Sequence, residues 1–415
     1  IVFSCHLDHQ LPGANDNASG CVTILEVART FAKLFAEGKL ARPARTLRFV
    51  WPPEIEGTLT LLNARPQLVP RIQAVVHMDM VGGGPETKAI FSVTRSPASL
   101  PSFVNDVAEA FGEFVNEQSA EFASTGRAAY PLVAPEGGKE ALLAQMAEFS
   151  SGSDHQVYTE GSYRIPAIYF NDWPDRYIHT NFDSPANIDP TKLKRAAFIG
   201  AASAYFLANL APDDIPTISR VLQANTLRRT SMMLSRRAQL VSDEAANLTR
   251  FHLGYERALV DSIERFLPVP EAIRAEAARF FDSLEKTVGG VAPPPSPTGD
   301  GRLVFLRNRE PKGPMSVFVY DYFNNHYGEE RSRGVRLLRF RGLRGDGGDY
   351  AYEVLNFVDG RRTAQEIRRF HGADQRVPNC KGVYFTRDVH KHRLAYISFG
   401  VTKLVLFLDK HKHFK

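Results

Sequence analysis

Short apolar runs alternate with helix-like stretches over the first 210 residues, and this alternation constrains the fold most. Four runs read as strands: residues 1–5 (IVFSC), 47–51 (LRFVW), 74–81 (AVVHMDMV) and 165–170 (IPAIYF). Three stretches carry apolar side chains at helical spacing: residues 22–38, 103–117 and 192–210. Strands that alternate with helices predict an α/β fold, with a mostly parallel or mixed sheet flanked by helices.

The chain has 415 residues and is expected to contain more than one domain. Turn-forming residues near Pro212 close the α/β domain, which we place at 1–212. Beyond it we expect a helical segment at 213–290, a linker at 291–301 (VAPPPSPTGDG) and a small α+β module at 302–415. The sequence begins with Ile1 inside a strand-like run, so we interpret the domain as truncated at its N-terminus.

Charge divides the chain into two parts. Residues 301–415 hold 23 Lys and Arg against 12 Asp and Glu, a net of +11, whereas residues 1–300 have a net of −6. No apolar run approaches the roughly 20 residues of a membrane helix, so no membrane span is expected. The three cysteines, Cys5, Cys21 and Cys380, form neither a disulfide framework nor a cysteine-rich zinc site.

Metal-binding residue types follow the predicted strands. His6 and Asp8 follow the first strand, Glu54 the second, Asp79 ends the third, and the fourth leads toward His179. Ligand sites in open α/β sheets form outside the carboxyl ends of the strands. We therefore expect these side chains to meet at one edge of the sheet. They are joined there by a residue of the turn GANDNASG (13–20), Asp16.

Each candidate also has an ordinary structural interpretation. His6 and His179 are of a type common in polar loops, Glu54 follows two prolines and suits a solvated loop, and Asp16 could cap the next helix. Asp79 is harder to explain in this way, because an Asp inside an apolar strand is costly to bury without a partner or a metal. Binding of metal by His9 or His77 is not expected.

Six motifs together resemble the zinc aminopeptidases of the M28 metallopeptidases, in a divergent branch with a PE-x-x-G-[ST] segment. They are CHLDH (5–9), GANDNASG (13–20), PEIEGT (53–58), HMDMVGGG (77–84), SGSDHQVY (151–158) and YIHTNFDSPANID (177–189). Their order and spacing also agree, and the resemblance covers about residues 1–210.

The resemblance implies a role for each matching residue. His6 and Asp79 would hold one zinc ion, His179 would help to hold a second, and Asp16 would bridge the two. Asp8 would orient the His6 imidazole. Glu54 would be the general base that takes a proton from water.

Around this set, three residues of the fifth motif are expected to shape the pocket wall: Ser153, Asp154 and His155. One position departs from the family pattern, in which a second glutamate follows the catalytic one and binds zinc. Here that residue is Ile55, so the second ion lacks a ligand. Glu56 is a possible replacement, shifted by one position. One or two zinc ions per chain are therefore expected.

The rear module has its own resemblance. Residues 352–369 contain an apolar run, an Asp359-Gly360 turn and the capping-box pair Thr363 and Glu366. The segment resembles small winged-helix modules appended to enzymes. Nucleic-acid binding is not expected, because no aromatic-rich basic stripe or RNA motif is visible.

These features predict a zinc-dependent exopeptidase, in the first place an aminopeptidase acting on peptides. Three alternatives stay open: a non-catalytic or one-zinc binding protein of the same family, a carboxypeptidase, and a nucleic-acid-associated protein acting through the rear module. The acidic front half disfavours a carboxypeptidase, which needs a basic pocket. The family resemblance implies an extracytoplasmic location, and no oligomeric state follows from the sequence.

Overall fold

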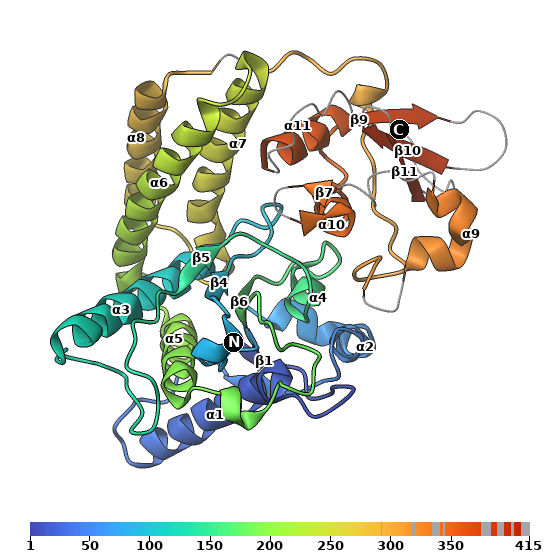
Figure 1. Cartoon of the computed structure of the whole chain (residues 1–415). Helices are drawn as coiled ribbons and strands as arrows, with labels where there is room; N and C mark the ends of the chain where they lie inside the picture. The colour runs from blue at the N-terminus through green and yellow to red at the C-terminus, as the bar shows by residue number, and fades with distance from the viewer. Residues whose placement is uncertain are drawn as a thin grey trace. The chain divides into compact units, whose positions relative to one another are not determined.

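The described residues group into two units. The computed structural model describes residues 1–291, 293–317, 321–333, 341–342, 345–374, 383–387, 394–399 and 402–407 (Figure 1). The first unit comprises residues 1–159, 163–222 and 259–273. The second comprises residues 160–162, 223–258 and 274–415. The expected helical segment is therefore shared between the units, because residues 259–273 group with the first one.

A six-stranded mixed sheet is the centre of the first unit. Its strands are β1 (Val2–Ser4), β2 (Arg48–Val50), β3 (Val75–Asp79), β4 (Phe91–Thr94), β5 (Gln145–Ala147) and β6 (Ala167–Asp172), in the order β2-β1-β3-β6-β4-β5. Strands β2, β1, β3 and β6 run parallel to one another, and β4 runs antiparallel to β6. The carboxyl ends of these four parallel strands therefore lie at one edge.

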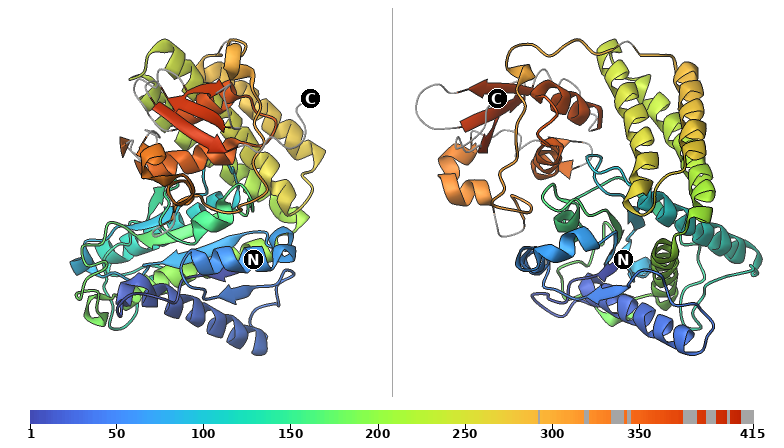
Figure 2. Two further views of the ribbon diagram at one scale, coloured as in Figure 1. Left: turned by 90° about the vertical axis from the view of Figure 1, so that its right-hand side faces the viewer. Right: turned by 180° about the vertical axis from the view of Figure 1, so that it is seen from behind.

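Helices cover both faces of this sheet. Helices α1 (Gly20–Ala36), α3 (Val104–Thr125) and α5 (Pro190–Asn209) pack together on one face, and α2 (Glu56–Ala64) and α4 (His155–Thr159) lie on the other (Figures 1 and 2). Helix α1 buries Ile24, Val27 and Phe31, which recur at helical spacing. Asp189 begins α5 as its N-cap and accepts a hydrogen bond from the backbone of Thr191.

Burial explains why the strands read as continuous apolar runs. Residues 75, 76 and 78 of β3 are fully buried between the two helical layers. Phe3 of β1 lies opposite Phe49 of β2, and their rings stack with centroids 4.8 Å apart. The predicted α/β class with a mixed sheet is confirmed. The sequence did not predict β4, β5, α2 or α4.

Helices dominate residues 215–288, as predicted. They are α6 (Ile215–Arg237), α7 (Ser242–Asp261) and α8 (Glu271–Val288). Within the second unit, Glu256 is buried and accepts hydrogen bonds from the Thr226 hydroxyl and the Arg229 guanidinium, both at 2.7 Å. Short helical turns connect the longer elements of the chain: η2 (Pro66–Arg71), η3 (Pro85–Thr87), η4 (Pro185–Asn187), η5 (Pro212–Asp214), η6 (Ser262–Arg265) and η7 (Gly299–Arg302).

The rear module is α+β in its described part. It contains α9 (Tyr322–Arg333), the strand pair β7 (Arg341–Gly342) and β8 (Gly345–Asp346), α10 (Gly347–Phe357) and α11 (Ala364–Asp374). Strands β9 (Val383–Arg387), β10 (Leu394–Phe399) and β11 (Thr402–Phe407) form an antiparallel sheet. The predicted capping box at the start of α11 is confirmed: Thr363 N donates to Glu366 Oε2 at 2.7 Å, and Glu366 N donates to Thr363 Oγ1 at 3.3 Å. The winged-helix assignment stays a prediction, and Cys380 lies outside the described residues.

Among the described helices, none is both long and apolar enough to cross a membrane.

Candidate metal centre

The carboxyl edge of the sheet gathers histidines and carboxylates from distant parts of the chain. Strand β1 leads into His6, β2 into Glu54, β3 ends at Asp79, and β6 precedes the loop that carries His179. Asp16 lies in η1 (Ala14–Ser19), directly before α1. The structure brings these five residues together, as the strand-end argument predicts.

The inner donor group consists of His6, Glu54 and Asp79, whose donor atoms lie within 4.8 Å of one another. His6 Nε2 is 3.3 Å from Asp79 Oδ1. His6 Nδ1 donates to the backbone oxygen of Asp8 at 2.9 Å. His6 and Asp79 are almost completely buried, at 2% and 4% exposure. This group is therefore held rigidly at the ends of two core strands.

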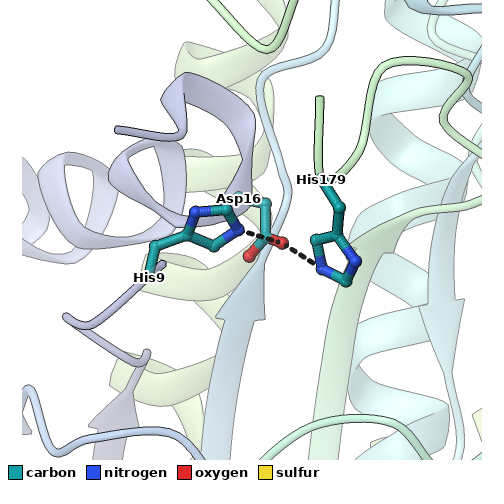
Figure 3. Close-up of side chains that lie close together, drawn as sticks. All are labelled: His9, Asp16 and His179. Atoms are coloured by element: carbon teal, nitrogen blue, oxygen red, sulfur yellow. Dashed lines mark hydrogen bonds and ion pairs between the residues drawn. The ribbon is translucent and has the colours of Figure 1, made fainter. Parts of the chain in front are cut away.

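The outer donor group consists of His9, Asp16 and His179, again within 4.8 Å (Figure 3). The Nε2 atoms of His9 and His179 approach Asp16 Oδ2 from two sides, at 3.2 and 3.0 Å. The second carboxylate oxygen of Asp16, Oδ1, is 3.2 Å from His6 Nε2. Asp16 thus connects the two donor groups. The position of His9 differs from the sequence-based expectation, which left it out of the metal site.

Close backbone packing fixes the loop that carries Asp16. A side chain at Gly13 would place its Cβ 1.9 Å from the Asp16 carbonyl oxygen, and one at Gly20 would lie 2.3 Å from the carbonyl oxygen of Met78 in β3. Only glycine allows these approaches. The Asp183 carboxylate accepts hydrogen bonds from the backbone N–H groups of Asn15 and Asp16, at 2.7 and 3.0 Å. Sequence reasoning missed Asp183, although it lies four residues after His179 in the same motif.

Negative charge dominates the electrostatics of the inner donor group. Burial on its own would lower the pKa of His6, but the Asp79 carboxylate and hydrogen bonds with Asp16 and Asp79 raise it to about 12. Burial, followed by repulsion from Asp79, raises the pKa of Glu54 to about 9. The arrangement therefore favours positive charge at the centre of the group, supplied by a proton or by a cation.

The Glu54 loop is held from both sides by carboxylates. Asp8 Oδ1 accepts from the backbone N–H of Glu54 at 2.7 Å, and Asp154 Oδ1 accepts from that of Ile55 at 3.0 Å. Asp8 was expected to orient the His6 imidazole. Its carbonyl oxygen accepts from His6 Nδ1 at 2.9 Å, and its carboxylate oxygen Oδ1 lies 3.8 Å from the same nitrogen.

Neither residue after Glu54 enters a donor group. Ile55 is buried, with 1% exposure, and adopts a φ of 55°, which is rare for a β-branched residue. Glu56 is exposed at the start of α2 and is absent from both donor groups of the described residues. The structure therefore does not bring Glu56 to the place of the missing ligand.

The three predicted pocket residues are buried beneath the site. Asp154 supports Ile55, and burial raises its pKa to about 7. Ser153 Oγ lies 2.8 Å from His77 Nε2. His155 stacks on Tyr169 with ring centroids 3.9 Å apart, and burial lowers its pKa to about 4. Of the three, Asp154 supports the Glu54 loop directly, and the expectation that they form a pocket wall stays a prediction.

The geometry of both donor groups fits zinc. Ligands about 2.0–2.2 Å from a tetrahedral zinc ion lie roughly 3.3 Å from one another. The Nε2-to-carboxylate distances at Asp16 and Asp79 are 3.0–3.3 Å. Imidazole nitrogens and carboxylate oxygens, without thiolates, are also the donors typical of catalytic zinc sites. The chain therefore offers two adjoining sites of the right size and chemistry.

Comparison with known proteins gives independent information on the first unit. The model of peptidase family M28 matches residues 1–204. A probable zinc metalloprotease of Pyricularia oryzae is 26% identical over 231 residues, which cover 48% of this chain and 43% of that protein. The chain thus spans less than half the length of this curated relative.

Solved structures also resemble part of the chain. A zinc aminopeptidase from Bacillus subtilis is 20% identical, with a TM-score of 0.38, over 51% of this chain and 46% of its own. A glutaminyl cyclase from Macrostomum lignano is 16% identical, with a TM-score of 0.38, over 51% of this chain and 68% of its own.

Proposed function

Residues 1–204 form a peptidase family M28 domain, and from this premise we propose that the chain is a zinc-dependent aminopeptidase. It removes N-terminal residues from peptides by hydrolysis. The observation that carries the proposal is the pair of donor groups, with Glu54 in the inner one, connected by the Asp16 carboxylate, which faces His6 with Oδ1 and His9 with Oδ2. Two adjoining cation sites and a buried carboxylate are the components of metal-assisted hydrolysis.

His6, Asp79 and Asp16 would hold the first zinc ion, and Asp16 and His179 would contribute to the second. Bound zinc supplies a Lewis acid that polarises the scissile carbonyl group and makes water acidic enough to react at neutral pH. The protein fixes the His6 imidazole for this purpose. Its Nδ1–H is held by the Asp8 carbonyl, which leaves the Nε2 lone pair directed at the site.

Glu54 acts as the general base. Its carboxylate accepts the proton of the attacking water and then delivers it to the leaving amine nitrogen. The backbone of Glu54 is fixed by Asp8 at 2.7 Å, and the next peptide group by Asp154 at 3.0 Å. This support on both sides fixes the backbone from which the Glu54 carboxylate extends toward His6 and Asp79.

The charge of the site supports cleavage at the N-terminal end. In the described part of the chain, the hydrogen bonds and ion pairs of both donor groups involve only histidines, carboxylates and backbone groups. No Lys or Arg side chain is among these partners, so they offer no cation for the substrate carboxylate that a carboxypeptidase must hold, and the net charge of −6 over residues 1–300 favours an ammonium group. We therefore favour the aminopeptidase.

One experiment separates this function from its alternatives. The metal content of the purified chain is measured by inductively coupled plasma mass spectrometry, together with hydrolysis of aminoacyl-coumarin substrates and of the same substrates with an acetylated amine. The proposal predicts bound zinc and turnover of the free-amine substrates only. Zinc without turnover of any substrate would indicate a binding protein, and cleavage from the carboxyl end of a peptide would indicate a carboxypeptidase.

A further inference from the structure

We propose that His9 replaces the missing glutamate as the third protein ligand of the second zinc ion. The inference rests on the proposed function and extends it, because the position that should supply this ligand is occupied by Ile55. The buried Ile55 side chain has no donor atom, and the exposed Glu56 lies in neither donor group. Without His9, Asp16 and His179 alone would hold the outer ion.

The ring of His9 is held in the same way as the ring of His6. His6 Nδ1 contacts the carbonyl oxygen of Asp8, and His9 Nδ1 contacts that of Leu11 at 2.5 Å, two residues ahead in each case. A carbonyl oxygen only accepts hydrogen bonds, so these contacts assign the proton to Nδ1 in both rings. The Leu11 N–H also approaches His9 Nδ1, at the longer distance of 3.4 Å. The Nε2 atom is then the one available to a metal, as in zinc-binding histidines oriented by a backbone carbonyl.

Both imidazoles direct Nε2 at the same carboxylate. His6 faces Asp16 Oδ1 at 3.2 Å, and His9 faces Asp16 Oδ2 at 3.2 Å. Across Asp16, the ring of His179 lies opposite that of His9, with ring centroids 5.5 Å apart (Figure 3). The three donor atoms of the outer group surround one point, which gives a set of two nitrogens and one oxygen.

The exchange of a carboxylate for an imidazole changes the chemistry of this ion. The ligand set has one negative charge fewer than a set with glutamate, and its second nitrogen favours zinc over the oxygen-preferring Mn²⁺ and Mg²⁺. The outer site is also more open to solvent, because the side chain of His179 is 69% exposed and that of His9 is 19% exposed. We expect the outer ion to exchange faster than the inner one.

The test measures metal binding and does not depend on turnover. The wild-type chain, His9→Ala, His179→Ala and the control His326→Ala are titrated with Co²⁺, followed by visible absorption, and with Zn²⁺, followed by mass spectrometry of the bound metal. His326 is exposed in α9 and serves as the matched histidine control. Wild type and the control should bind two ions. His9→Ala and His179→Ala should each keep one ion and bind the second more than about 100-fold more weakly, since even a ligand's supporting partner is worth 10–100-fold.

A further variant tests the role of the donor atom itself. His9→Glu restores a carboxylate and should recover the second ion, with Mn²⁺ competing better than in the wild type. Thermal unfolding of the metal-free forms checks that each variant folds.

The inference is overturned if His9→Ala binds two ions as tightly as the wild type, or if the wild type itself binds only one. Failure of the proposed function looks different: a wild type that binds two ions but hydrolyses no peptide would contradict the enzyme assignment and leave the ligand assignment standing.

Discussion

The two halves of the metal centre are built in opposite ways. The inner donor group stands on the ends of β1 and β3, and its His6 and Asp79 are nearly inaccessible. The outer group stands on loops, and its His179 is mostly exposed. Asp16, a member of the outer group, also faces His6 of the inner group. The comparison suggests a division of roles: the sheet would fix the ligands of one ion, and loop residues such as His9 would supply a different ligand set for the other.

Asp16→Asn should have the largest effect, because it alters both halves at once. The amide removes the negative charge that faces three imidazoles, so we expect loss of both ions. The value of kcat/KM should fall by at least about 10³-fold, roughly 4 kcal/mol of transition-state stabilisation. Metal analysis and peptide hydrolysis measure the two losses. Retention of the inner ion would show that the halves are independent.

Glu54→Gln should separate chemistry from metal binding in the inner half. Loss of the general base lowers kcat by about 10²–10⁴-fold, while both ions stay bound. The matched control is Glu56→Gln, two residues along the same loop, which should keep full activity because Glu56 is exposed. If Glu54→Gln also released a zinc ion, Glu54 would be a ligand and its assigned role would be wrong.

Stepwise removal of metal compares the two halves directly. Dialysis against increasing concentrations of a chelator should release the outer ion first, since its ligands are exposed, and the inner ion at least about tenfold more slowly. The number of ions remaining is followed by mass spectrometry. Simultaneous loss of both would contradict the distinction between a buried and an exposed site.

Asp8→Ala should have the smallest effect. The carboxylate supports the backbone of Glu54 at 2.7 Å, whereas the contact with His6 comes from the carbonyl group, which the variant keeps. We therefore expect kcat to fall about 10-fold, near the lower end of the effects of supporting residues, with unchanged metal content. A loss of zinc instead would mean that the Asp8 carboxylate, and not only the carbonyl group, is needed to orient His6.

The sequence predicted the inner half well for a physical reason. Parallel strands end at one edge, so a His, Glu or Asp directly after an apolar run is placed by the sheet itself. His6, Glu54 and Asp79 follow this rule. Length does not explain the strands that were missed, because β1 and β2 are also only three residues long. Strands β4 (FSVT) and β5 (QMA) lack a continuous apolar run like those that were recognised.

The outer donor group could not be predicted from the sequence in the same way. His9 lies three residues after His6 in a loop without periodicity, so nothing in the sequence states where its ring points. Only the fold shows that the Leu11 carbonyl turns Nε2 toward Asp16. For a similar reason, the sequence does not distinguish a contact that Asp8 makes through its carboxylate from one that it makes through its carbonyl group.

Anomalous diffraction at the zinc absorption edge, from crystals of the full chain grown with zinc, tests the central claim most directly. The account predicts two peaks on either side of Asp16, one in contact with His6 and Asp79 and the other with His9 and His179. A single peak at the inner group would overturn the assignment of His9. The absence of zinc from both groups would contradict the account as a whole.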